Sequence, residues 1–231
     1  MALKKPLYKC VIFDCDGTLV DTLKDIEYSM NTALAEHGFP AVPSEKYRDM
    51  VGWGIIKLAE LALPQDVRTK ENIVSVGYMA GRLLEEITQE QSLSEPYQGI
   101  KELLRDITSM RSGSKKLSIA VLSNKEDAAL RYLIDRLFGP HIFDAVCGLR
   151  PGITPKPNPV ALWDILVDFG CKPSEAVFVG DSEIDIETAR NAGCFPLGAS
   201  WGFRSRSVLQ EAGAGHIIDS PKEILDFFKG V

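Results

Sequence analysis

The sequence has few histidines and no ordered pattern of cysteines. Its 231 residues include 3 histidines and 5 cysteines, and no two cysteines form a Cys-x-x-Cys pair. An odd and scattered set of thiols is evidence against a disulfide framework or a zinc site and favours a reducing, cytoplasmic compartment. The histidines do not show the spacing of metal ligands, so a histidine-based metal centre is not expected.

The chain also lacks an excess of basic residues and a long apolar run. Lys and Arg total 26 against 32 Asp and Glu, which gives a formal net charge of −6, and basic residues nowhere form a run longer than two. Proteins that bind a nucleic-acid backbone usually carry a basic patch. No segment approaches the ~18 apolar residues of a membrane span, and the first residues lack the apolar stretch of a signal peptide. We therefore expect neither a nucleic-acid partner nor a membrane partner.

What is present is an ordinary globular composition, with 45% hydrophobic and 25% charged residues. The length exceeds the usual single-domain size of roughly 100 to 150 residues, so we expect one large domain or two unequal ones.

Strand and helix patterns alternate on both sides of a helical block. The apolar run 8–13 predicts a strand, and a helix is predicted over 22–37, begun by a capping box of Thr22 and Asp25. From 41 to 95 the apolar spacing is helical throughout. Short apolar runs after this block predict further strands, at 117–122, 145–147, 176–179, 195–197 and 216–218.

This alternation predicts an α/β fold with a Rossmann-like, doubly wound, mostly parallel sheet. The helical block predicts an inserted all-helical cap domain. We expect residues 1–20 and 96–231 to form the catalytic core domain and residues 21–95 to form the cap.

Polar clusters follow three of the predicted strands. They contain Asp14 and Asp16, then Ser123 and Asn124, and then Asp181 with Asp185; Lys156 lies in a proline-rich loop. The carboxyl ends of parallel strands meet at one edge of the sheet, so these side chains are expected to converge there. Cys15, next to Asp14 on an extended strand, points the other way and is interpreted as an inert core residue.

Four converging carboxylates repel one another unless a cation joins them. Oxygen ligands of this kind suit Mg²⁺. A carboxylate beside Mg²⁺ and a lysine can attack phosphorus, because both cations offset the repulsion between the two anions. A second aspartate two residues away can protonate the leaving oxygen and later activate water. The clusters therefore favour phosphoryl transfer.

Four sequence motifs carry a family resemblance. They are Asp14-x-Asp16-Gly17-Thr18, Ser123, Lys156-Pro157-x-Pro159 and Gly180-Asp181-x3-Asp185, and they resemble in order and spacing those of the haloacid dehalogenase superfamily. The resemblance implies that Asp14 is the nucleophile that forms an aspartyl-phosphate. It implies that Asp16 is the general acid and base, with its backbone carbonyl on Mg²⁺.

The same resemblance implies roles for the remaining motif residues. Ser123 and Asn124 would hold the phosphate, and Lys156 would neutralise the nucleophile and the phosphoryl group. Asp181 would be a Mg²⁺ ligand, and Asp185 a ligand or a water-mediated support. A second interpretation of Asp185 remains open, in which it only starts a helix by interacting with the helix dipole.

The helical insertion between the first two motifs matches the small-cap class of the superfamily. Within that class, the first motif, Val51-Gly52-Trp53-Gly54, and the stretch from Trp201 to Arg206 look most like phosphoglycolate phosphatases. Trp53 is expected to contact the substrate from a loop with flanking glycines, or else to be a core aromatic. Arg204 is a candidate for binding the substrate's anionic end, or else a surface charge.

Together these features predict a Mg²⁺-dependent hydrolase of small phosphomonoesters, acting on a small phosphorylated metabolite as a monomer or homodimer. A sugar phosphomutase resembling β-phosphoglucomutase or a pyrophosphatase of the same superfamily would use the same residues and stays open. A non-enzymatic binding protein is disfavoured, because it has no need to keep mutually repelling carboxylates together.

Overall fold

The structure is a computed structural model that describes residues 8–112 and 115–229. Residues 1–7 and 230–231, which the sequence analysis assigns to the core domain, lie outside the described residues. No helix in the described ranges combines the length and the apolar character needed to cross a bilayer.

A six-stranded parallel sheet forms the centre of the core, in the order β10-β9-β8-β1-β6-β7. β1 lies in the interior of the sheet, paired with β6 and β8. Its four residues are fully buried, as expected for a strand covered on both faces. The predicted α/β fold class is thereby confirmed. The strands are β1 (Cys10–Phe13), β6 (Ser118–Glu126), β7 (Ala145–Leu149), β8 (Ala176–Gly180), β9 (Phe195–Ala199) and β10 (His216–Ile218).

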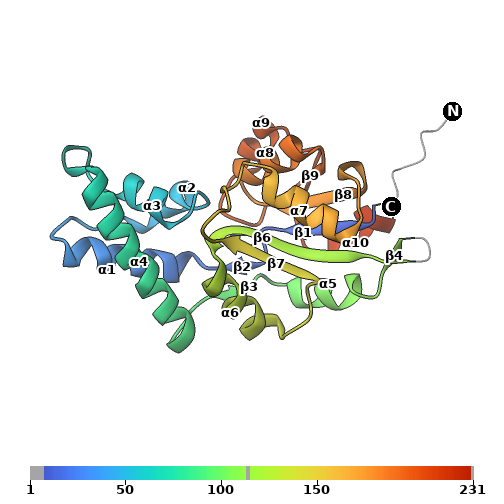
Figure 1. The fold of residues 1–231 in the computed structure, drawn as a ribbon, viewed down its shortest axis with the longest axis horizontal. Coiled ribbons are helices and arrows are strands. Elements are labelled where there is room, and N and C mark those ends of the chain that lie inside the picture. Colours follow the sequence, from blue (N-terminus) through green and yellow to red (C-terminus); the bar gives the residue numbers. More distant parts are fainter. Residues whose placement is uncertain (1–7, 113–114, 230–231) are drawn as a thin grey trace.

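Helices cover both faces of this sheet (Figure 1). Because side chains alternate along a strand, Val11 and Phe13 enter one apolar cluster and Cys10 and Ile12 enter the other. The first cluster includes residues of α5, α6 and α10, and the second includes residues of α7 and α8. Cys15 is buried in the first cluster, as predicted. The helices are α5 (Ile100–Ile107), α6 (Asp127–Phe138), α7 (Val160–Phe169), α8 (Glu183–Ala192), α9 (Arg206–Ala212) and α10 (Lys222–Lys229).

The segment between β1 and α5 folds into a separate helical layer, called the cap below (Figure 1). Its helices enclose an apolar cluster of their own, which also takes in Phe203 from the core. A two-stranded antiparallel ribbon joins cap and core, with β2 (Val20–Asp21) paired to β3 (Glu95–Pro96). The cap helices are α1 (Leu23–Glu36), α2 (Ser44–Met50), α3 (Ile55–Ala62) and α4 (Lys70–Glu90), with a 3₁₀ turn at Gln65–Val67.

The predicted capping box at the start of α1 is wrong. The side chain of Thr22 makes no capping hydrogen bond. Asp25 instead accepts hydrogen bonds from the hydroxyls of Ser92 and Ser94 and from the backbone amides of Leu93 and Ser94. The carboxylate therefore holds the segment that leads from the cap back to the core. These partners lie at least 67 residues further along the chain, so local sequence spacing does not predict them.

Several elements differ from the predicted ones. β6 does not stop at Leu122 but continues through the polar residues to Glu126, after a shift in its register with β7. α9 was missed, although both of its end signals are in the sequence: the Ser205 side chain accepts from the Val208 amide, and Gly213 ends the helix in the left-handed conformation. A short pair of strands, β4 (Arg111–Ser112) and β5 (Lys115–Lys116), and a 3₁₀ turn at Pro173–Glu175 complete the described elements.

Candidate active site

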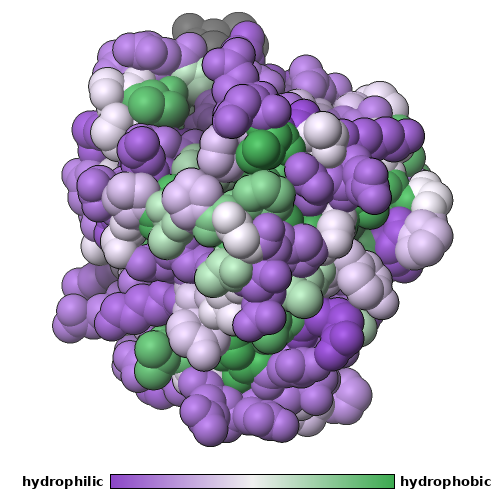
Figure 2. Space-filling model, turned by 90° about the vertical axis from the view of Figure 1, so that its left-hand side faces the viewer, coloured by the Kyte–Doolittle hydropathy of each residue, from purple (hydrophilic) through white to green (hydrophobic). Residues whose placement is uncertain are grey.

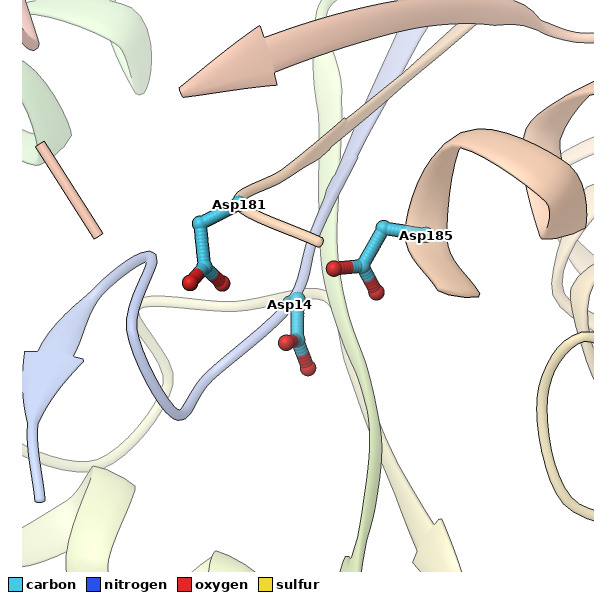
Figure 3. Close-up of side chains that lie close together, drawn as sticks. All are labelled: Asp14, Asp181 and Asp185. Carbon is cyan, nitrogen blue, oxygen red and sulfur yellow. The ribbon is translucent and has the colours of Figure 1, made fainter. Parts of the chain in front are cut away.

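The polar clusters predicted from the sequence meet at the carboxyl edge of the sheet. Asp14 directly follows β1, and its backbone amide donates to the Val179 carbonyl of the neighbouring strand β8. Asp181 directly follows β8, and Asp185 lies in the first turn of α8. Oxygen atoms of these three buried carboxylates lie within 4.8 Å of one another. Figure 3 shows their side chains converging from three separate segments.

Lys156 lies among these carboxylates. Its Nζ is 2.8 Å from Asp14 Oδ1 and 2.6 Å from Asp185 Oδ1, and the lysine is buried. The contact with Asp14 is an ion pair without the geometry of a hydrogen bond, so Asp14 Oδ1 is a buried oxygen with no hydrogen-bond donor among the described residues. One lysine thus contacts two carboxylates and leaves part of their charge unbalanced.

The electrostatics of the cluster reflect this shortage of positive charge. Burial, and then repulsion from Asp185, raise the pKa of Asp14 to about 7, although Lys156 opposes the shift. Burial, together with repulsion from Asp185 and Asp14, raises the pKa of Asp181 well above its usual value. Burial alone would lower the pKa of Lys156, but the attraction of Asp14 and Asp185 raises it, so this lysine stays charged.

Two glycines, Gly17 and Gly202, lie directly against the side chain of Asp181. A Cβ atom at Gly17 would lie 2.3 Å from Asp181 Oδ2, and one at Gly202 would lie 2.3 Å from the Asp181 Cβ. The same carboxylate accepts a hydrogen bond from Thr18 Oγ1 (3.0 Å) and one from the Phe203 amide (2.7 Å). The glycines therefore let two loops approach Asp181 closely, and the two donors fix its orientation.

The two carboxylate oxygens of Asp185 have different partners. Its Oδ2 accepts from the amide and the hydroxyl of Ser182, a capping box that starts α8. Its Oδ1 accepts from Lys156. One oxygen thus starts the helix while the other faces the lysine and the neighbouring carboxylates.

Asp16 is not part of the three-carboxylate cluster. Its carboxylate lies 3.1 Å from Nζ of Lys125, a buried lysine at the end of β6. Lys125 was not among the predicted site residues, although this lysine directly follows the polar pair Ser123 and Asn124 in the sequence. Both Asp16 and Lys125 line the cavity described below.

Ser123 and Asn124 are buried at the end of β6. Ser123 Oγ accepts from the Lys125 amide at 3.3 Å. The Asn124 side chain accepts from the Lys156 amide and donates to the Lys156 carbonyl, at 2.8 and 3.1 Å, and its Nδ2 also donates to the Gly52 carbonyl at 2.9 Å. Asn124 therefore holds the lysine loop and touches the cap loop that carries Trp53.

The structure corrects the expectation for Arg204. Its side chain is buried, pairs with Glu183 at 3.0 Å, and donates to the backbone carbonyls of Arg48 and Asp49 in the last turn of α2 and of Val51 in the loop that follows. These contacts engage the guanidinium within the protein, so Arg204 joins core to cap rather than facing a substrate. Trp53, in the same loop, does line the cavity between cap and core.

The residues present fit a bound divalent cation. Four carboxylates and two lysines gather at this edge of the sheet, a formal excess of two negative charges. The donor set consists of carboxylate oxygens, which Mg²⁺ prefers, and one buried oxygen, Asp14 Oδ1, lacks a hydrogen-bond donor among the described groups. Asp14 and Asp181 would hold such an ion, with Asp185 beside them.

Comparison with known proteins places the chain among hydrolases. The family model of the haloacid dehalogenase-like hydrolases matches residues 11–199. The chain is 31% identical, over 221 residues, to phosphoglycolate phosphatase from Vibrio parahaemolyticus, covering 94% of this chain and 95% of the relative. It is 28% identical over 232 residues to phosphoglycolate phosphatase from Haemophilus influenzae, covering 94% and 97%.

Solved structures share the whole fold. The crystal structure of a predicted phosphoglycolate phosphatase from Haemophilus somnus superposes with a TM-score of 0.83 at 26% identity, covering 96% of this chain and 98% of that one. A haloacid dehalogenase-like family protein from Streptococcus pneumoniae gives the same TM-score at 22% identity, covering 96% and 99%, and supports the fold alone.

Proposed function

This chain belongs to the haloacid dehalogenase-like hydrolase family, and on that premise we propose that it hydrolyses phosphomonoesters in two steps through a phosphorylated Asp14. The observation that carries the proposal is the contact of one buried lysine, Lys156, with both Asp14 and Asp185 beside Asp181. A buried carboxylate in this setting has an oxygen with no hydrogen-bond donor among the described residues, a cation to offset the incoming phosphate, and neighbours that hold it in place.

In the first step Asp14 attacks phosphorus and the ester oxygen leaves. Lys156 offsets the charge that builds up on the phosphoryl oxygens, which is the main task of a phosphoryl-transfer site. The hydroxyl of Ser123 and the backbone at Asn124 would hold the transferring group, since both residues lie in the last part of β6, at the same edge of the sheet.

Asp16 would donate a proton to the leaving oxygen and then take one from the water that attacks the aspartyl-phosphate. Lys125, 3.1 Å from its carboxylate, would hold Asp16 in position for both transfers. The second step returns Asp14 to its starting form and releases inorganic phosphate.

Asp14 and Asp181 would hold Mg²⁺, with Asp185 as a ligand or as a support through water and the Asp16 carbonyl as the ligand implied by the family resemblance. When bound, the ion would offset the charge of these carboxylates and polarise the substrate phosphate. We also propose domain boundaries at residues 20/21 and 95/96, because the β2–β3 ribbon contains both crossings between core and cap.

Phosphate release from a panel of esters, with Mg²⁺ and with a chelator in its place, tests the proposal. The relatives' name makes 2-phosphoglycolate the first ester to include, alongside nucleoside monophosphates, pyrophosphate and β-glucose 1-phosphate. We expect Mg²⁺-dependent release from at least one monoester. In parallel, Mg²⁺ should raise the melting temperature of the wild-type protein, because a ligand that binds only the folded state stabilises it.

The panel also separates the alternatives. Isomerisation of glucose 1-phosphate without net phosphate release would indicate a mutase, and release from pyrophosphate alone would indicate a pyrophosphatase. No Mg²⁺-dependent reaction with any ester, in a protein that Mg²⁺ does not stabilise, would contradict the proposed function.

A further inference from the structure

A chamber of about 670 Å³ lies between cap and core, directly over the candidate active site. Its core end contains Asp14, Asp16, Ser123 and Lys125, together with Asn124, Glu126, Ala129, Leu149 and Pro155, and its remaining walls come from the cap. Glycolate, the leaving group of 2-phosphoglycolate, has only two carbon atoms. The chamber therefore has room for a far larger leaving group.

The cap side of this chamber is largely apolar. Trp53 enters it from the loop after α2, where Gly52 and Gly54 on either side adopt φ values of 120° and 87°. α3 and α4 supply most of the remaining surface. The apolar side chains of the cap wall are Ile26, Val51, Trp53, Ile55, Ile56, Leu58, Tyr78 and Leu84.

Two of these apolar side chains are exposed to solvent. Ile56 is 45% exposed and Tyr78 is 70% exposed. In Figure 2, which faces the cap end, hydrophobic residues lie scattered among hydrophilic ones. Because both side chains also line the chamber, their exposed apolar surface is available to a ligand that enters it.

The charged groups of the cap wall do not suit a second anionic group on the substrate. Lys57 is paired with Glu60 at 2.9 Å, and Arg82 with Glu86 at 2.8 Å. Glu85 also lines the chamber. Among the described residues of this wall, each cation is thus matched by a neighbouring carboxylate, and a substrate carboxylate would meet no net positive charge.

We propose that this enzyme prefers phosphomonoesters whose leaving group is apolar and of aromatic size, bound in the cap chamber against Trp53 and Tyr78. The inference rests on the proposed function for the chemistry of the phosphate, and on the chamber alone for the leaving group. Burial of an aromatic ring against these side chains provides the discrimination, since binding energy scales with the apolar area removed from water.

Three alkyl esters provide the test: 2-phenylethyl phosphate, ethyl phosphate and 2-phosphoglycolate. The first two release simple primary alcohols, so a difference between them reports binding of the phenyl ring rather than the ease of bond cleavage. We expect kcat/KM for 2-phenylethyl phosphate to exceed each of the other two at least tenfold. Equal values, or a preference for 2-phosphoglycolate that Arg82→Gln removes, would overturn the inference.

Variants in the cap wall show which side chains produce the preference for the phenyl ester. Trp53→Ala and Tyr78→Ala should each reduce the ratio of kcat/KM between the phenylethyl and ethyl esters by at least threefold, and Trp53→Phe should keep most of it. Trp163→Ala is the matched control, because Trp163 lies on α7, outside the chamber lining. A ratio that is unchanged in Trp53→Ala and Tyr78→Ala would contradict the assigned subsite.

Binding measurements keep the inference separate from the proposed function. Phosphonates cannot be hydrolysed, so calorimetry with 3-phenylpropylphosphonate and propylphosphonate in the presence of Mg²⁺ reports the subsite alone. We expect the phenyl compound to bind at least tenfold more tightly. If it does so while no ester is turned over, the chamber assignment stands and the proposed function fails; equal affinities would refute the chamber assignment.

Discussion

The two ends of the cavity are built in opposite ways. At the core end, buried side chains contact one another at fixed distances, as in the contacts of Lys156 with Asp14 and Asp185 and of Lys125 with Asp16. At the cap end, apolar side chains line an open chamber, and the charged groups are exposed pairs such as Arg82 with Glu86.

This difference separates chemistry from selectivity. A buried ionic network has one low-energy arrangement, because breaking any contact leaves a charge unpaired in a medium of low dielectric constant. An apolar wall tolerates changes of shape and composition at little cost. The core end can therefore keep one reaction while substitutions at the cap end change which leaving group the enzyme accepts.

The largest expected effect is at the nucleophile. Asp14→Asn should lower kcat for phosphate release by about 10⁴-fold or more, because the amide cannot form the covalent intermediate. Its thermal stability should be equal to or higher than that of the wild type, since the change removes one of several repelling carboxylates. Measured turnover within tenfold of the wild-type value would contradict the role of Asp14.

Arg204 makes several of the contacts between cap and core. Arg204→Ala should reduce the free energy of unfolding by about 3 kcal/mol, because it leaves three backbone carbonyls and Glu183 without their donor. Arg206→Ala is the control, since the exposed pair of Arg206 with Asp219 contributes at most about 1 kcal/mol. Denaturant unfolding of both variants checks this; equal losses would mean that Arg204 does not join cap and core.

Close packing at the core end can be tested with a single added methyl group. Gly202→Ala places a Cβ 2.3 Å from the Asp181 Cβ and should cost about 1–3 kcal/mol of stability and weaken stabilisation by Mg²⁺. At the cap end, Gly81→Ala adds a Cβ 3.7 Å from Ile55 Cγ2 and should leave the free energy of unfolding equal or raise it by up to about 1 kcal/mol. Similar losses in both variants would remove the contrast between the two ends.

The smallest expected effect on stability is at Asp25, which binds the segment that leads from the cap back to the core. Burial alone would raise the pKa of Asp25, but hydrogen bonds from Ser92, Ser94 and the Leu93 amide lower it. A carboxyl with a lowered folded-state pKa stabilises the protein above its unfolded pKa of about 3.9, and this stabilisation is lost as the pH falls through the folded value. Asp25→Asn should thus be less stable than the wild type at pH 6, by about 1 kcal/mol, and the gap should shrink below pH 4.

Thermal unfolding from pH 6 to pH 3 checks this expectation. The exposed Asp66 provides the control, because Asp66→Asn should show a small difference from the wild type that stays nearly constant with pH. A gap for Asp25→Asn that does not depend on pH would contradict the role assigned to its hydrogen bonds.

The sequence predicted the core end far better than the contacts between the ends. Parallel strands must bring their carboxyl ends to one edge, so Asp14 and Asp181 could be brought together from strand patterns alone. The partners of Lys125 and Asp25 and the cap partners of Arg204 could not, because each of these contacts joins segments at least 67 residues apart. Helix α9 is a different case, since its end signals, Ser205 and Gly213, are local and are sufficient to predict a helix between them.

The central claim is that the phosphoryl group passes through Asp14. Asp16→Asn keeps the nucleophile but removes the base that activates water, so the intermediate should accumulate. Incubation of this variant with Mg²⁺ and a turned-over ester, followed by acid quench and peptide mass spectrometry, should show one added phosphoryl group on the peptide that contains Asp14. Turnover without a phosphorylated peptide at any time point, or a phosphoryl group on another residue, would contradict the account.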